Sequence, residues 1–196
     1  SEGGEGEMSI REQLQDWLVR YGFIAVTVIL FAWFLISEET FRQPSTLFSM
    51  LKFTSVVAIV GLGVTFTMVV GGLDLSVGSV AGLAVTISAM MMVIYAFTGF
   101  FSGAMVLVAG AAVGMLNAIL IVWMKIPDLL ATLGMMFIVM GLKLLPVDGQ
   151  SVSSKMILRD GSVAPGRFTE GFLQIDRAFI GIVPLPVVIW ISLTAI

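Results

Sequence analysis

Long apolar runs separated by short polar breaks dominate this sequence and predict a bundle of membrane-spanning helices. A helix needs roughly twenty apolar residues to cross about 30 Å of hydrocarbon. Six runs approach that length, at about 22–36, 51–70, 77–96, 104–123, 129–145 and 180–196. The first run is short unless the segment before it continues as helix. We therefore predict an all-α, polytopic membrane fold with about six transmembrane helices.

The first twenty residues are more polar than these runs and form a separate region. Residues 1–7 are acidic and glycine-rich, which is typical of disorder. Residues 8–20 place Ile10, Leu14 and Leu18 on one helical face, with charged residues opposite. This pattern predicts an amphipathic helix at the membrane surface, preceding a transmembrane domain over residues 21–196.

Residues 146–179 form the only sizeable polar segment within the apolar part of the chain. Glycine, serine, proline and aspartate are frequent there, so we predict an extramembrane loop. The sixth apolar run is still uninterrupted at Ile196, with no polar residue to anchor its far end. We therefore expect this sequence to be the N-terminal part of a longer protein.

Composition supports the membrane assignment and excludes several function classes. The 196 residues are 58% apolar and only 12% charged, with a mean hydropathy of +1.07. Soluble domains carry about 25% charged residues. The chain has no cysteine and no histidine, which excludes disulfides, thiolate or imidazole metal ligands and nucleophiles of these types. The net charge of −3 argues against nucleic acid as a partner.

No catalytic constellation or nucleotide-binding loop is evident. The sequence contains no G-x-x-x-x-G-K-[ST] pattern, and its serines have no histidine to act as a base. We therefore predict that the chain is not an enzyme. No cofactor or metal is expected on this chain, and any ATP and magnesium would bind a separate ATPase chain.

The segment VVGGLDLSVGSVAG, at 69–82, interrupts the apolar runs and is the most informative part of the chain. Gly71 and Gly72 disfavour helix, while Asp74 and Ser76 are good N-caps for a following helix. Asp74 is also the only formal charge between Lys52 and Lys125. Broken helices at membrane depth line cavities or are buried in protein, and transporters build substrate sites there.

Two interpretations of this break stay open at the level of sequence. Asp74 either caps a helix in an ordinary interfacial loop or lies beside a translocation path. A proton-coupling role is less favoured, because no second intramembrane acid or histidine is evident. The candidate residues for a substrate path or gate are Gly72, Asp74, Ser76, Asn117 and Thr132. Those for the helix break and for close helix packing are Gly71, Gly78, Gly82, Gly110 and Gly114.

Several blocks in the same order resemble the ribose-type, monosaccharide permeases of bacterial ABC importers. The segment GGLDLSVGS at 71–79 is similar to their signature, with Leu73 where isoleucine is usual. GMLNAILI, from Gly114, resembles their Gly-x-x-Asn-Gly element, with Ala118 replacing the second glycine. Residues 126–142, IPDLLATLGMMFIVMGL, and 181–190, GIVPLPVVIW, resemble two further blocks, with Met140 where arginine is common.

The resemblance implies a roughly ten-helix, multi-pass permease of the bacterial inner membrane. It implies a second permease copy or paralogue, cytoplasmic ATP-binding subunits and a periplasmic or lipid-anchored sugar-binding protein as partners. The N-terminus would be cytoplasmic and the 146–179 loop periplasmic, although the Lys and Arg count does not support that orientation. Alternatives are a permease for autoinducer-2, nucleosides or branched-chain amino acids, or an ATP-independent secondary transporter or channel.

Overall fold

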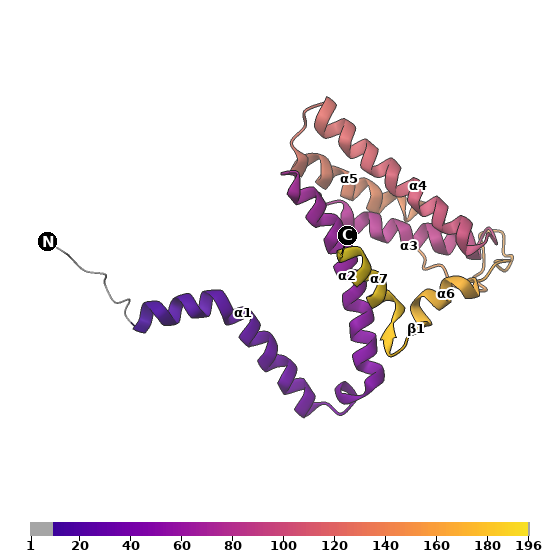
Figure 1. Cartoon of the computed structure of the whole chain (residues 1–196). Helices are drawn as coiled ribbons and strands as arrows, with labels where there is room; N and C mark the ends of the chain where they lie inside the picture. Colours follow the sequence, from indigo (N-terminus) through magenta and orange to yellow (C-terminus); the bar gives the residue numbers. More distant parts are fainter. Residues whose placement is uncertain (1–9, 196) are drawn as a thin grey trace. The chain divides into compact units, whose positions relative to one another are not determined.

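The computed structural model describes residues 10–195 and is mostly helical with almost no strand, which confirms the all-α prediction (Figure 1). By length and composition, four helical segments of the described chain are able to cross a membrane: Leu18–Ser37, Pro44–Val69, Gly99–Trp123 and Asp128–Val147. Shorter apolar helices, Val77–Val93 and Leu185–Thr194, occupy the other two predicted spans. The chain divides into two compact units, Ser1–Met50 and Leu51–Ile196.

The first unit is dominated by a single long helix, α1 (Ile10–Ser37). The predicted surface helix and first span are therefore one continuous element, because no proline and no glycine pair interrupts this stretch. A short 3₁₀ turn, η1 (Thr40–Arg42), follows. The centre of the Phe41 ring lies 5.3 Å from that of Phe31 and 5.6 Å from that of Phe34. The predicted disordered residues 1–7 lie outside the described residues.

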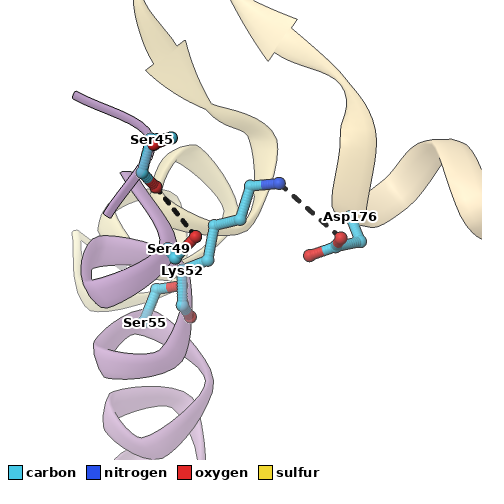
Figure 2. Close-up of polar contacts among 5 residues, drawn as sticks. All are labelled: Ser45, Ser49, Lys52, Ser55 and Asp176. Carbon is cyan, nitrogen blue, oxygen red and sulfur yellow. Dashed lines mark hydrogen bonds and ion pairs between the residues drawn. The ribbon is translucent and has the colours of Figure 1, made fainter. Parts of the chain in front are cut away.

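Helix α2 (Pro44–Val69) begins seven residues before the predicted second span. Proline is favoured in the first turn of a helix, where its missing N–H is not needed. Serine side chains are tolerated in this helix because their hydroxyl groups donate to carbonyls of the same helix. The Ser49 hydroxyl donates to the Ser45 carbonyl at 2.8 Å, and the Ser55 hydroxyl donates to the Lys52 carbonyl at 2.7 Å (Figure 2).

Three helices pack side by side in the second unit: α3 (Val77–Val93), α4 (Gly99–Ala118) and α5 (Asp128–Leu142) (Figure 1). Their shared core contains Val113, Met135 and Val139, which are at most 8% exposed. Helix α4 begins five residues before the predicted fourth span, where the Thr98 hydroxyl caps it. It continues into a π-helical turn, η2 (Ile119–Trp123), and α5 is followed by a 3₁₀ turn, η3 (Leu145–Val147).

The predicted extramembrane loop contains more regular structure than its composition suggested. It includes helix α6 (Glu170–Arg177) and the strand β1 (Phe179–Ile180), which pairs antiparallel with β2 (Val183–Pro184). The sixth apolar helix, α7 (Leu185–Thr194), therefore begins at Leu185 and not at Ile180. The helix begins later than predicted because Gly181 adopts a φ of 64° and turns the chain into a hairpin.

An ion pair fastens α6 to α2 (Figure 2). The Lys52 ammonium lies 3.6 Å from the Asp176 carboxylate and 5.5 Å from the centre of the Phe179 ring. The Asp176 side chain is 72% exposed, so the pair contributes at most about 1 kcal/mol. Its main effect is to orient α6 and the hairpin against α2, and to neutralise a lysine inside a long apolar helix.

The segment before α6 is clamped onto the end of α3. The Gly166 amide donates to the Val93 carbonyl at 2.9 Å, and the Thr169 hydroxyl lies 3.7 Å from the Met92 sulfur. A Cβ on Gly166 would lie 2.0 Å from the Met92 carbonyl oxygen, which leaves room only for glycine. This close backbone approach holds the polar segment against the membrane helices.

We predict that Gly166→Ala destabilises the full-length protein by about 1–3 kcal/mol, because the added methyl group must displace the backbone of α3. Thermal unfolding in detergent, followed by tryptophan fluorescence, measures the effect. Gly171→Ala is the matched control, since nothing lies within 4 Å of its Cβ. Equal melting temperatures for the two variants would contradict the clamp.

Candidate functional site

The break between α2 and α3 occupies residues 70–76 and forms a tight turn around two glycines. The Gly71 amide donates to the Met68 carbonyl at 2.9 Å, and the Gly72 amide donates to the Thr67 carbonyl at 3.0 Å. Gly71 adopts a φ of 81°, a conformation that residues with a Cβ rarely take. The predicted interruption at these glycines is therefore present, and the chain leaves α2 without a long loop.

Asp74, Ser76 and Asn117 form a connected polar cluster. One Asp74 carboxylate oxygen, Oδ1, accepts hydrogen bonds from the Ser76 amide at 2.7 Å and the Ser76 hydroxyl at 2.6 Å. The Asn117 side-chain amide, from α4, donates to the same hydroxyl at 3.0 Å. Two predicted site residues on the break are thus joined to one that lies 41 positions further along the chain.

This cluster corrects part of the capping prediction. Ser76 is the residue before α3, but its hydroxyl makes no bond to an N–H of the first turn. Its hydrogen is given to Asp74, and its lone pair accepts from Asn117. Asp74 does satisfy a backbone amide, that of Ser76, in an Asx turn. The Ser76 side chain therefore connects helices instead of capping one.

The N-terminal part of α5 binds the backbone of Leu73 and Leu75 in the break. The Leu73 amide donates to the Asp128 carboxylate at 2.7 Å. The Leu75 amide donates to the Thr132 hydroxyl at 3.2 Å, and that hydroxyl lies 3.3 Å from the Leu73 carbonyl and 2.9 Å from the Asp128 carbonyl. Thr132, a predicted site residue, is only 1% exposed.

Asp128 is a site residue that the sequence prediction missed. It is absent from the candidate residues selected from the sequence, although an acid directly after Pro127 at a helix start is a recognisable signal. Its partner, the Leu73 amide, lies 55 positions away, and no local pattern indicates that pairing. The predicted site therefore contains two carboxylates, one on the break and one at the start of α5.

A cavity of about 640 Å³ opens beside these residues. It is lined by Gly72, Asp74 and Thr132 from the predicted site, by Asp128 and Lys125, and by apolar residues that include Ile121 and Val122. The last two belong to the π-helical turn η2, a distortion that is often found at functional sites. Ser76 and Asn117 do not line this cavity but lie behind Asp74 and hold it in position.

Asn117 has a buried side-chain oxygen that accepts no hydrogen bond from the described residues. Its residue is 5% exposed, and its side-chain oxygen, Oδ1, is the only buried side-chain nitrogen or oxygen without a hydrogen-bond partner within the described part of the chain. Leaving such a group unsatisfied costs about 1–3 kcal/mol. Few buried polar groups in folded proteins lack a partner, so the orphan acceptor distinguishes this cluster from ordinary helix packing.

The predicted packing glycines behave differently from one another. A Cβ on Gly82 would lie 2.9 Å from the Lys143 ammonium, so Gly82 does give room to a side chain from the segment after α5. Gly78, Gly110 and Gly114 have no atom within 4 Å of an added Cβ. The structure therefore does not place these three glycines against a neighbouring helix of this chain.

One protein family and several known transport proteins match this chain. The family described as branched-chain amino acid transport system, permease component, matches residues 46–196. The ribose import permease of Haemophilus influenzae is 31% identical over 67% of this chain and 40% of its own length. The galactose/methyl galactoside import permease of Salmonella typhimurium is 30% identical over 70% of this chain and 44% of its own length.

A third relative widens the range of named solutes. The autoinducer 2 import system permease of Photorhabdus luminescens is 30% identical over 62% of this chain and 36% of its own length. The chain thus spans less than half the length of each of these relatives. No solved structure matches the chain.

We predict that Asp128→Ala releases the break, because the Leu73 amide loses its acceptor. Hydrogen bonds to charged groups contribute about 1.5–3 kcal/mol, so amide exchange of residues 70–76 is expected to become at least about tenfold faster. Hydrogen–deuterium exchange with mass spectrometry measures this directly. Asp128→Asn keeps an oxygen acceptor and should exchange more slowly than the alanine variant. Unchanged exchange in Asp128→Ala would show that this bond does not hold the break.

Proposed function

We propose, from the premise that this chain belongs to the permease-component family of branched-chain amino acid transport systems, that it forms part of the translocation path of a bacterial importer for a monosaccharide or similar small polar solute. Members of this family are transport subunits and not enzymes, and the chain is a multi-pass protein of the inner membrane. The observation that carries the proposal is the cavity where two carboxylates and a hydroxyl meet at a broken helix.

The lining of this cavity suits a polyhydroxylated solute. Carboxylate oxygens accept hydrogen bonds from hydroxyl groups, and Asp74 has a second oxygen, Oδ2, beyond the one bonded to Ser76. Lys125 adds a donor, while Ile121 and Val122 offer apolar surface for the face of a sugar ring. Ligand sites typically combine a mostly apolar wall with a few fixed polar groups in a volume of about 300–1,000 Å³.

The transport step in this proposal involves no covalent chemistry. Gly71 and Gly72 let the backbone turn, and the Asp74–Ser76–Asn117 cluster links that turn to α4. A movement of α4 or α5 would therefore reposition Asp74 in the cavity. The unpaired Asn117 oxygen is an acceptor that a different arrangement of the break could satisfy. Solute would shift the balance only through different affinity for the two arrangements.

Energy would come from partner chains. A second permease copy or paralogue, cytoplasmic subunits that bind ATP and magnesium, and a periplasmic or lipid-anchored solute-binding protein would complete the importer. Family membership supports this arrangement over an ATP-independent transporter. The number of acids near the cavity does not decide between the two, because Asp128 supplies a second carboxylate beside Asp74.

The relative named for autoinducer 2 makes that molecule a second candidate solute, to be tested beside ribose and galactose.

We predict that Asp74→Asn lowers solute uptake by the intact importer at least about tenfold, because the cavity loses its charged acceptor while the Asx turn keeps an oxygen. Uptake of radiolabelled ribose, galactose or autoinducer 2 into proteoliposomes or cells measures the effect.

Asp160→Asn is the matched control for this prediction. Asp160 makes the same turn, accepting from the Ser162 amide at 2.9 Å and the Ser162 hydroxyl at 2.6 Å, but it lies in the exposed loop. The Ser162 hydroxyl and amide lower the pKa of Asp160, so this control also removes a charge at neutral pH. Equal uptake by the two variants would remove Asp74 from the path.

We also expect the full-length permease, purified under mild conditions from its native membrane, to retain an ATP-binding subunit. Mass spectrometry of the purified complex identifies a partner that carries a G-x-x-x-x-G-K-[ST] loop. Recovery of the permease as an isolated subunit that still concentrates solute would instead support an ATP-independent transporter.

A further inference from the structure

A second cavity lies at the other end of α3, away from the broken helix. Its volume is about 800 Å³, and it is formed where the clamped segment at 164–169 meets the end of α3 and the start of α4. The floor is apolar and includes Met92, Ala164 and Leu173. Gly166 and Thr169 hold this segment in place through their contacts with Val93 and Met92, so the cavity is built on fixed elements.

The charges around this cavity are all positive. Lys155 and Arg167 line it, together with the hydroxyl groups of Thr98, Ser154 and Thr169, and no acidic residue is among the lining residues. Neither Lys155 nor Arg167 forms an ion pair within the described part of the chain. The neighbouring Arg159 is different, because it is already paired with Asp148. Two unpaired cations on an apolar floor favour an anionic group attached to an apolar body.

An apolar groove continues directly from this cavity. It has a volume of about 450 Å³ and shares Thr98 and Thr169 with the cavity. Phe100 of α4 and Phe172 and Ile175 of α6 form its walls, and the groove contains no charged residue. The two hollows together present a cationic, hydroxyl-rich compartment joined to a hydrocarbon one.

The two hollows lie at the end of a helical segment long enough to span a membrane, where the membrane surface is expected. They lie where α3 ends at Val93 and α4, which belongs to a segment able to span the membrane, begins at Gly99. Aromatic side chains surround this corner: the Phe97 ring lies 4.5 Å from that of Phe101 and 6.4 Å from that of Tyr95. Tyrosine and other aromatic residues gather at headgroup depth in membrane proteins.

We propose that this double hollow binds an anionic phospholipid. The lipid phosphate lies between Lys155 and Arg167, and one acyl chain follows the groove along Phe100 and Phe172. A zwitterionic lipid satisfies the groove but brings its own positive charge to the cations. A free phosphate ion satisfies the cations but leaves the groove empty. The anionic phospholipid is the membrane component that satisfies both compartments.

The experiment measures lipid binding to the full-length permease in detergent micelles by native mass spectrometry and by thermal stabilisation. The probes are dioleoyl phosphatidylglycerol, dioleoyl phosphatidylcholine and inorganic phosphate. The test variant is Lys155→Gln/Arg167→Gln. The control, Arg42→Gln/Arg177→Gln, also loses two positive charges, and neither of its residues lines the cavity. Lys155→Arg/Arg167→Lys keeps both charges and shows whether the segment tolerates substitution.

Phosphatidylglycerol is expected to bind the wild type, the control and the charge-conserving variant, and to bind the test variant about thirtyfold more weakly, at roughly a fivefold loss for each basic residue. A photoreactive acyl chain on this lipid should crosslink to Phe172 or Ile175. Equal weakening in the test and control variants would overturn the proposal in favour of non-specific charge attraction. Equal stabilisation by inorganic phosphate would overturn it in favour of a free-anion site. Crosslinking confined to other helices would overturn the groove assignment.

Discussion

The hydrogen bond between the Leu73 amide and the Asp128 carboxylate is the interaction on which the candidate site depends. A helix broken within a membrane bundle exposes backbone amides and carbonyls that lipid cannot satisfy. Here the first two turns of α5 supply the partners, since Asp128 accepts from Leu73 and Thr132 bonds to both Leu73 and Leu75. The break is stable because another helix replaces the hydrogen bonds that the missing helical turn would have made.

The need to satisfy the broken backbone divides the polar residues of the site into two groups. Thr132 and Asp128 satisfy the backbone and also face the cavity, while Ser76 and Asn117 lie behind it and position Asp74. The same Asx turn occurs at Asp160 and Ser162, in an exposed segment with no cavity of this kind. The local geometry of an aspartate and a serine therefore does not make a site. Burial, a second carboxylate and an unsatisfied asparagine oxygen distinguish the first turn from the second.

The basic residues that oppose the expected orientation do not all have the same surroundings in the structure. The positive-inside rule counts every lysine and arginine near a span as equivalent. In the structure, Lys52 is paired with Asp176, and Arg159 is paired with Asp148. Lys155 and Arg167 remain unpaired, and they gather at one cavity. Ion pairing does not change the number of lysines and arginines, so their count still does not support the expected orientation.

The sequence by itself determined the all-α class, the apolar runs and the position of the break, because these depend on hydropathy and on the backbone preferences of neighbouring residues. It also selected Gly72, Asp74, Ser76, Asn117 and Thr132, since polar groups are rare in apolar spans. Several boundaries were wrong for local reasons. Ser45 and Ser49 are tolerated within α2, and the Gly181 turn delays α7 to Leu185.

Only the tertiary structure decided how these residues act. Asn117 meets Ser76 across 41 positions, and Asp128 meets Leu73 across 55, so no local pattern contains either contact. The packing of α3 against α4 and α5 brings them together, and it also leaves Gly78, Gly110 and Gly114 facing open space. Hydropathy reports which residues leave water, whereas the choice of partner depends on how the helices pack, which is a property of the whole bundle.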